Sequence, residues 1–115
     1  MHKKDNQCYI CAKKGIDIYH FDLEEHHVFG GPNRKLSEHY GLKVYLCINH
    51  HRCGREAVHK NTQIMQDLHE DGQRAFEKAN PGLNFREIFG KNYLPGNKGI
   101  NPEYAHFINR FMRVE

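Results

Sequence analysis

The chain has 115 residues, a formal net charge of +3, and 38% hydrophobic residues with no Trp. This length suits one small domain, and so thin an apolar content predicts that cross-links supplement the core. No stretch approaches the roughly 20 apolar residues of a membrane helix, and no N-terminal run has the length of a signal peptide. We therefore expect a soluble, cytoplasmic protein with no membrane partner, whose charge tolerates an anionic partner without requiring one.

The first two Cys form a CxxC pair at Cys8 and Cys11, followed by two Lys and Gly15. In a reducing compartment, paired Cys in a His-rich chain favour metal ligation over disulfides. A redox CxxC should open a long amphipathic helix, whereas Gly15 ends any helix within one turn. Residues 8–15 are therefore predicted to form a zinc knuckle.

Branched and aromatic residues predominate from Ile16 to Phe29, which predicts one or two strands ending near His27. The Gly-Gly-Pro-Asn sequence that follows predicts a loop through residue 35, then a short polar piece to Gly41. Residues 42–46 predict a second strand because Leu, Val and Tyr recur there. The first half of the chain is thus read as two strands joined by a long loop.

The second half is predicted to be helical. Asn61 or Thr62 caps a helix that Gly72 weakens and Asn80-Pro81-Gly82 ends. Asn84 caps a shorter helix that Gly90 terminates. The expected boundaries are a domain at 1–94 (knuckle 8–15, ββα core 20–80, helix 84–90), a linker at 95–101 and a C-terminal helix at 102–115. The apolar stripe of that last helix fits either docking on the core or a homodimer contact.

The most informative stretch runs from Cys47 to His59 and contains five Cys or His residues. Cys47-x2-His50 would complete a four-ligand zinc site with the CxxC pair, which leaves His51 and His59 for the His26-His27 pair. Cys53 is either a substitute for His50 on zinc or a free thiol, and the tighter CxxH spacing favours the free thiol. Two metal sites are predicted, one closed and one open.

The order of these motifs carries a resemblance to a known family. A His pair ends the first strand in Glu24-Glu25-His26-His27, a Gly-Pro loop follows, and the second strand leads into Leu46-Cys47-x2-His50-His51. This order resembles the HNH nucleases of the ββα-metal (His-Me finger) superfamily, including small phage nucleases and RecA-dependent nucleases. The resemblance implies an α+β fold with a ββα-metal core, a structural zinc knuckle and added C-terminal helices.

The resemblance also assigns roles to individual residues. It implies that His27 is the general base and that a divalent catalytic ion is held by His26, His51 and His59. It implies a structural Zn2+ on Cys8, Cys11, Cys47 and His50. The reaction would be hydrolysis of DNA phosphodiester bonds, in which a His takes a proton from water and a cation stabilises charge on the phosphate. Three imidazoles are softer ligands than Mg2+ prefers, so Mn2+, Ni2+, Co2+ and Zn2+ are candidates beside Mg2+.

DNA is the partner that this activity requires, and five basic residues flank the proposed metal ligands. They are candidate phosphate contacts: Lys43, Arg52, Arg55, Arg34 and Lys35. A phage setting follows from the resemblance alone, with phage or host recombination or packaging proteins as further partners.

The sequence departs from the family at its middle Asn. None occurs near residues 41–44, so the orienting role is unassigned among Asn33, Asn49 and His39. Adjacent strand residues point to opposite faces, so the strand should end or bulge at His26-His27 for both to reach one phosphate. Glu24 or Glu25 is expected to hydrogen-bond an imidazole of the open site.

Two simpler interpretations stand beside the nuclease hypothesis. Five His are read as surface residues: His2, His20, His39, His69 and His106. The rival to the whole hypothesis is a non-catalytic zinc-finger module that binds nucleic acid or protein. Such a module needs the zinc ligands but has no use for His27, which is the feature that separates the two.

Overall fold

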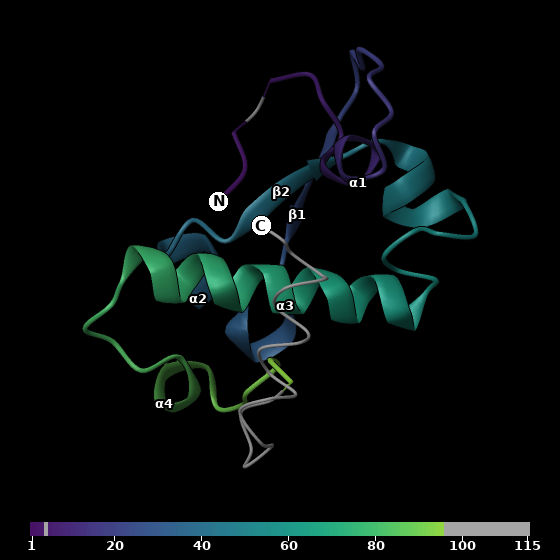
Figure 1. Cartoon of the computed structure of the whole chain (residues 1–115). Coiled ribbons are helices and arrows are strands. Elements are labelled where there is room, and N and C mark those ends of the chain that lie inside the picture. Colours follow the sequence, from purple (N-terminus) through teal and green to yellow (C-terminus); the bar gives the residue numbers. More distant parts are fainter. Residues whose placement is uncertain (4, 96–115) are drawn as a thin grey trace, which may run out of the picture.

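The computed structural model describes residues 1–3 and 5–95, which form a small mixed α/β fold around a two-stranded sheet (Figure 1). The predicted helix at 102–115, and the predicted linker beyond its first residue, lie outside the described residues. The two antiparallel strands are β1, Glu24–His27, and β2, Lys43–Leu46. The helices are α1 (Tyr9–Lys13), α2 (Arg34–His39), α3 (Thr62–Ala79) and α4 (Phe85–Phe89), with a 3-10 turn at Gly31–Asn33 and a π-helical turn at Asn49–Cys53.

The strands place His26 and His27 on opposite faces of the sheet. His26 pairs with Val44 and is buried with it, whereas His27 pairs with Lys43 on the more exposed face. The strand ends at His27 as expected, but it does so without a bulge, since Val28 N still donates to Leu42 O at 3.0 Å. The sheet therefore holds the two imidazoles on its opposite faces.

Of the one or two strands predicted within 16–29, the structure has one, which ends at His27 as predicted but begins only at Glu24. Most apolar side chains before it are exposed, with Tyr19 62% and Phe21 84% exposed. β-forming residues need a neighbouring strand or an apolar surface to pack on, and residues 16–22 meet neither in the described structure.

The predicted loop at 30–35 and the polar piece after it are wrong in part, because α2 forms there. Pro32 lies in the preceding 3-10 turn, and Arg34–His39 continues it as a helix. Ser37 is fully buried; its Oγ donates to Leu42 O at 2.6 Å and accepts from Phe29 N at 3.2 Å. These bonds close the connection between the strands and fix α2 beside β1.

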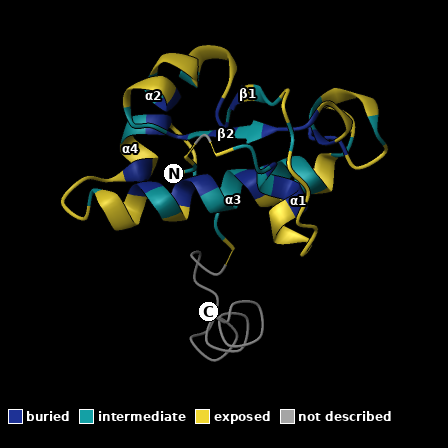
Figure 2. Ribbon diagram, turned by 90° about the horizontal axis from the view of Figure 1, so that it is seen from above, coloured by how far each residue is buried: buried dark blue, intermediate teal, exposed yellow. Residues whose placement is uncertain are grey.

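The long helix α3 lies across one face of the strand pair (Figure 1) and presents a buried side to it (Figure 2). Asn61 caps it, as predicted, by accepting from Ile64 N at 3.0 Å. Gly72 was predicted to weaken this helix, and the structure shows why a glycine lies there: a Cβ would be 2.6 Å from Val28 Cγ1. Gly72 thus permits close contact between α3 and the end of β1.

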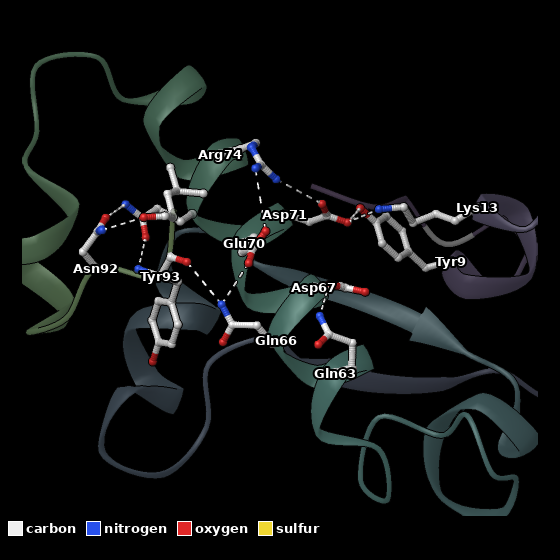
Figure 3. Close-up of polar contacts among 12 residues, drawn as sticks. Tyr9, Lys13, Gln63, Gln66, Asp67, Glu70, Asp71, Arg74, Asn92 and Tyr93 are labelled. Carbon is white, nitrogen blue, oxygen red and sulfur yellow. Dashed lines mark hydrogen bonds and ion pairs between the residues drawn. The ribbon is translucent and has the colours of Figure 1, made fainter. Parts of the chain in front are cut away.

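Polar contacts bind α1 and the segment after α4 to α3 (Figure 3). Asp71 of α3 accepts from the Tyr9 hydroxyl at 2.9 Å and pairs with Lys13, both on α1. Tyr93 N, beyond α4, donates to Gln73 Oε1 at 2.7 Å, and the Tyr93 ring packs on the core. Among the described residues, no helix combines the length and apolar character needed to cross a membrane.

Candidate metal centres

Four buried side chains converge where α1 meets the end of β2. We call them the Cys3His cluster: Cys8, Cys11, Cys47 and His50. Each is at most 7% exposed. The Nδ1 atom of His50 lies 3.7, 3.4 and 3.4 Å from the sulfurs of Cys8, Cys11 and Cys47, and Cys11 Sγ lies 4.0 Å from Cys47 Sγ.

These spacings match a tetrahedral zinc site. Zn–S bonds of about 2.3 Å and Zn–N bonds of about 2.0 Å place ligand atoms roughly 3.5 to 3.8 Å apart. Burial, followed by the neighbouring Cys8 and Cys47, raises the pKa of the Cys11 thiol to about 12. Without a cation the thiol form of Cys11 is favoured. A cation at the centre would favour the thiolates instead, because its charge offsets their mutual repulsion. The Cys3His cluster is therefore close enough, and of the right chemistry, to hold a metal such as zinc.

Two further residues lie beside the Cys3His cluster. His20, interpreted above as a surface residue, brings Nε2 to 3.8 Å from Cys11 Sγ. Lys14 lies 3.2 Å from His50 Nε2 and pairs with Glu56. Burial and the Lys14 charge lower the pKa of His50, which keeps the imidazole neutral as a ligand must be. Cys53 is exposed and free, outside the cluster.

A π-helical turn directs the adjacent His50 and His51 to different sites. Both backbone amides donate to Cys47 O, at 3.0 and 2.9 Å. The chain then doubles back, so that Val58 N donates to His50 O at 2.8 Å and His59 N to His51 O at 3.2 Å. His59 is thereby placed next to His51, although it comes eight positions later in the chain. No local sequence signal marks a π-helical turn, and it was not predicted.

The second group is the three-His cluster, His26, His51 and His59, whose ligand nitrogens lie within 4.8 Å of one another. His51 Nε2 and His59 Nε2 are 3.1 Å apart, and the His26 ring centroid lies 5.1 Å from each of the other two. Tetrahedral coordination with metal–nitrogen bonds of about 2.0 Å separates nitrogens by roughly 3.3 Å. The close nitrogen pair is within a few tenths of an ångström of that value.

His26 has an unmet hydrogen-bonding requirement in this cluster. Its Nε2 is the one buried side-chain nitrogen or oxygen among the described residues that lacks a hydrogen-bond partner. Burial first, and then His51 and His59, lowers the pKa of His26 to about 3. The imidazole is thus neutral at physiological pH, and a buried polar atom without a partner is unfavourable unless something binds it. A metal ion would satisfy it.

Glu24 sets the orientation of His51. Its Oε1 lies 2.7 Å from His51 Nδ1, and its carboxylate also accepts two bonds from Arg52, at 3.1 and 2.8 Å. Arg52, followed by His51, lowers the pKa of Glu24 to about 2, so the carboxylate is ionised and accepts from Nδ1–H. The Nε2 lone pair of His51 is then free to face the cluster. The expected carboxylate–imidazole bond is therefore present, and Glu24 makes it.

A surface hollow of about 290 Å³ joins the three-His cluster to His27. Its lining includes His26 and His27, although the two belong to opposite faces of β1, because the strand ends there. Arg34 and His69 line the same hollow. His69, interpreted above as a surface residue, is half-buried and stacks on Phe29 with ring centroids 5.3 Å apart.

The five basic candidates differ in how freely they can meet a phosphate. Lys43 and Arg52 are held in ion pairs by Glu25, Glu38 and Glu24. In the part of the chain that the structure describes, no carboxylate pairs with the exposed Arg34, Lys35 or Arg55. Arg34 and Lys35 line a second hollow, of about 480 Å³, that His27 also borders.

Comparisons with known proteins add no family assignment. No protein-family model matches the chain, and neither curated proteins nor solved structures yield a match. The chemistry of the residues themselves is therefore the basis for inferring what the protein does.

Proposed function

We propose that this protein is a metal-dependent endonuclease of the HNH type, with a ββα-metal core, that hydrolyses phosphodiester bonds in DNA. One observation carries the proposal: three histidines whose ligand nitrogens lie within 4.8 Å of one another line a solvent-accessible hollow together with a fourth, His27. A purely structural zinc site fills all four coordination positions with protein ligands, whereas a catalytic site has three protein ligands and leaves a position open. Here His59 is exposed and His51 half-buried, which leaves room for a substrate oxygen at the ion.

In the proposed reaction His27 accepts a proton from the attacking water, whose oxygen bonds to phosphorus as the P–O bond to the leaving sugar oxygen breaks. His26, His51 and His59 would hold one divalent ion, which supplies positive charge to the phosphate oxygens when bound. Glu24 keeps His51 in the tautomer that can ligate. Arg34 borders the same hollow and is a candidate to contact the phosphate. Mn2+, Ni2+, Co2+ and Zn2+ suit the imidazole set better than Mg2+.

The second part of the proposal is that the Cys3His cluster binds structural Zn2+. It would join α1 to the π-helical turn and so support the position of His51, one residue after His50. The metal of the cluster and that of the open site therefore have separate roles, one in folding and one in hydrolysis.

The test is cleavage of supercoiled plasmid across a range of divalent metals, comparing the parent with His51→Ala. We expect the parent to cleave and the variant to need a much higher metal concentration, while the variant still holds one zinc ion per chain at the Cys3His cluster. Lys78→Ala is the control, since Lys78 is exposed on α3, belongs to neither cluster and does not line the hollow. A parent that leaves plasmid intact with every metal contradicts the nuclease proposal.

The alternative is a non-catalytic zinc-finger module, which the Cys3His cluster alone supports. It predicts zinc-dependent folding and binding of nucleic acid or protein without cleavage. The assay above separates the two functions, because only the nuclease requires the three-His cluster and His27.

A further inference from the structure

We propose that Glu38 is the positioning residue for His27, taking the role for which no Asn is present near residues 41–44. The inference rests on the proposed function, because it assigns a role within that same site. It also concerns a residue with no counterpart among the candidates considered from the sequence.

The contact between the two side chains is short and well placed. Glu38 Oε1 lies 2.7 Å from His27 Nε2, within the range of a charge-assisted hydrogen bond. The bond lowers the pKa of Glu38, so the carboxylate is ionised and Nε2 carries the proton that it accepts. A proton fixed on Nε2 leaves the lone pair on Nδ1. Nδ1 is thus the atom of His27 that can take a proton from water.

Lys43 in turn fixes the carboxylate of Glu38. Its Nζ lies 3.3 Å from Glu38 Oε2 and 2.8 Å from Glu25 Oε2. Lys43 on β2 is the strand partner of His27 on β1. The residue that holds the Glu38 carboxylate therefore lies directly opposite the proposed base. The anchors of Glu38 are therefore one helix, α2, and one strand, β2.

A cation site is the other chemistry that this place suggests. The ligand atoms of Glu25, His27 and Glu38 lie within 4.8 Å of one another. The Lys43 ammonium, however, already lies against both carboxylates and neutralises them. A further cation would meet that positive charge, so a network that holds His27 is the better-supported interpretation.

The alternative to positioning is an ordinary surface ion pair. The Glu38 side chain is 57% exposed, and pairs that are so exposed contribute little to stability. A purely structural role therefore predicts almost no effect of substitution on either melting or catalysis. A positioning role predicts an effect on the rate of hydrolysis alone, because the imidazole would lose its preferred tautomer and orientation.

The experiment measures kcat and KM for DNA cleavage by the metal-loaded full chain and its variants. Glu38→Ala should lower kcat roughly 10- to 100-fold, as when an outer-shell partner of an imidazole is lost. KM and the melting midpoint should stay near parent values. Glu38→Gln should recover most of the rate, because its amide oxygen can still accept from Nε2–H. The control is Glu70→Ala, which removes a carboxylate on α3 that pairs with Arg74 at 3.8 Å and lines neither hollow.

Nitrogen NMR of the His27 ring gives a readout independent of turnover. We expect the proton on Nε2 in the parent and a mixture of tautomers in Glu38→Ala. A parental kcat in Glu38→Ala, or an equal loss in Glu38→Gln, overturns the positioning role and leaves the nuclease proposal intact. An inactive parent overturns the nuclease proposal, and with it this inference.

Discussion

Substituting Cys11 by Ser removes one of four ligands at a cluster that links two distant parts of the chain. Cys11 and Cys47 are 36 residues apart and bring their sulfurs to 4.0 Å. A cross-link closing a loop of this length lowers the entropy of the unfolded chain by an amount worth about 4 kcal/mol. A small domain has only roughly 5 to 15 kcal/mol of stability in total. The loss of this one link should therefore remove a large part of it.

The expected result is a lower melting midpoint together with the loss of bound zinc. At about 4 to 8 °C per kcal/mol for a domain of this size, a loss of about 4 kcal/mol lowers the midpoint by more than about 15 °C. Calorimetry and elemental analysis measure the two quantities on the same sample, and a strong chelator should destabilise the parent to a similar state. Cys53→Ser is the matched control, because Cys53 is exposed and outside the cluster. A Cys11→Ser chain with parental zinc and an undisturbed midpoint would refute the structural role of the metal.

Two further predictions concern the boundary of the domain and its pH dependence. Truncation after Leu94 should preserve folding and metal binding, because Tyr93 and its bonds to α3 are retained; a shortened chain that fails to fold or to bind zinc would place later residues in the core. The free energy of unfolding should decrease as the pH falls from about 6.5 toward 3. In this range His26 takes up a proton in the unfolded chain but not in the folded one, where its pKa is about 3. Urea titrations should give a shallower pH slope for His26→Gln than for the parent, and equal slopes would count against the burial of a neutral imidazole.

The sequence predicted best what depends on local spacing. The CxxC and CxxH pairs bring their ligands together within single turns, and the caps at Asn61 and Asn84 act within three residues. The first strand was predicted to begin too early, within 16–23, because branched and aromatic composition records the character of side chains but not whether a surface exists to cover them. The helix α2 was missed because its buried anchor, Ser37, is recognisable only from its two distant backbone partners.

In the candidate site, too, some residues could be predicted from the sequence and others only from the fold. The residues proposed for the three-His cluster came from motif order, and the structure brings their nitrogens together. The surroundings came from the fold. His69 and His20 gain their positions by packing, and Glu38 meets His27 only because α2 folds back beside β1. Such contacts leave no spacing signal in a single sequence.

The most direct test of the nuclease proposal is the rate of plasmid cleavage by His27→Ala relative to the parent. His27 is outside both candidate metal clusters, so the variant should fold, keep its metals and still bind DNA. Its cleavage rate should fall roughly 10²- to 10⁴-fold, the range expected for the loss of a general base. A His27→Ala protein that cleaves plasmid as fast as the parent with every divalent metal tested would contradict hydrolysis through this residue, and the zinc-finger alternative would then take its place.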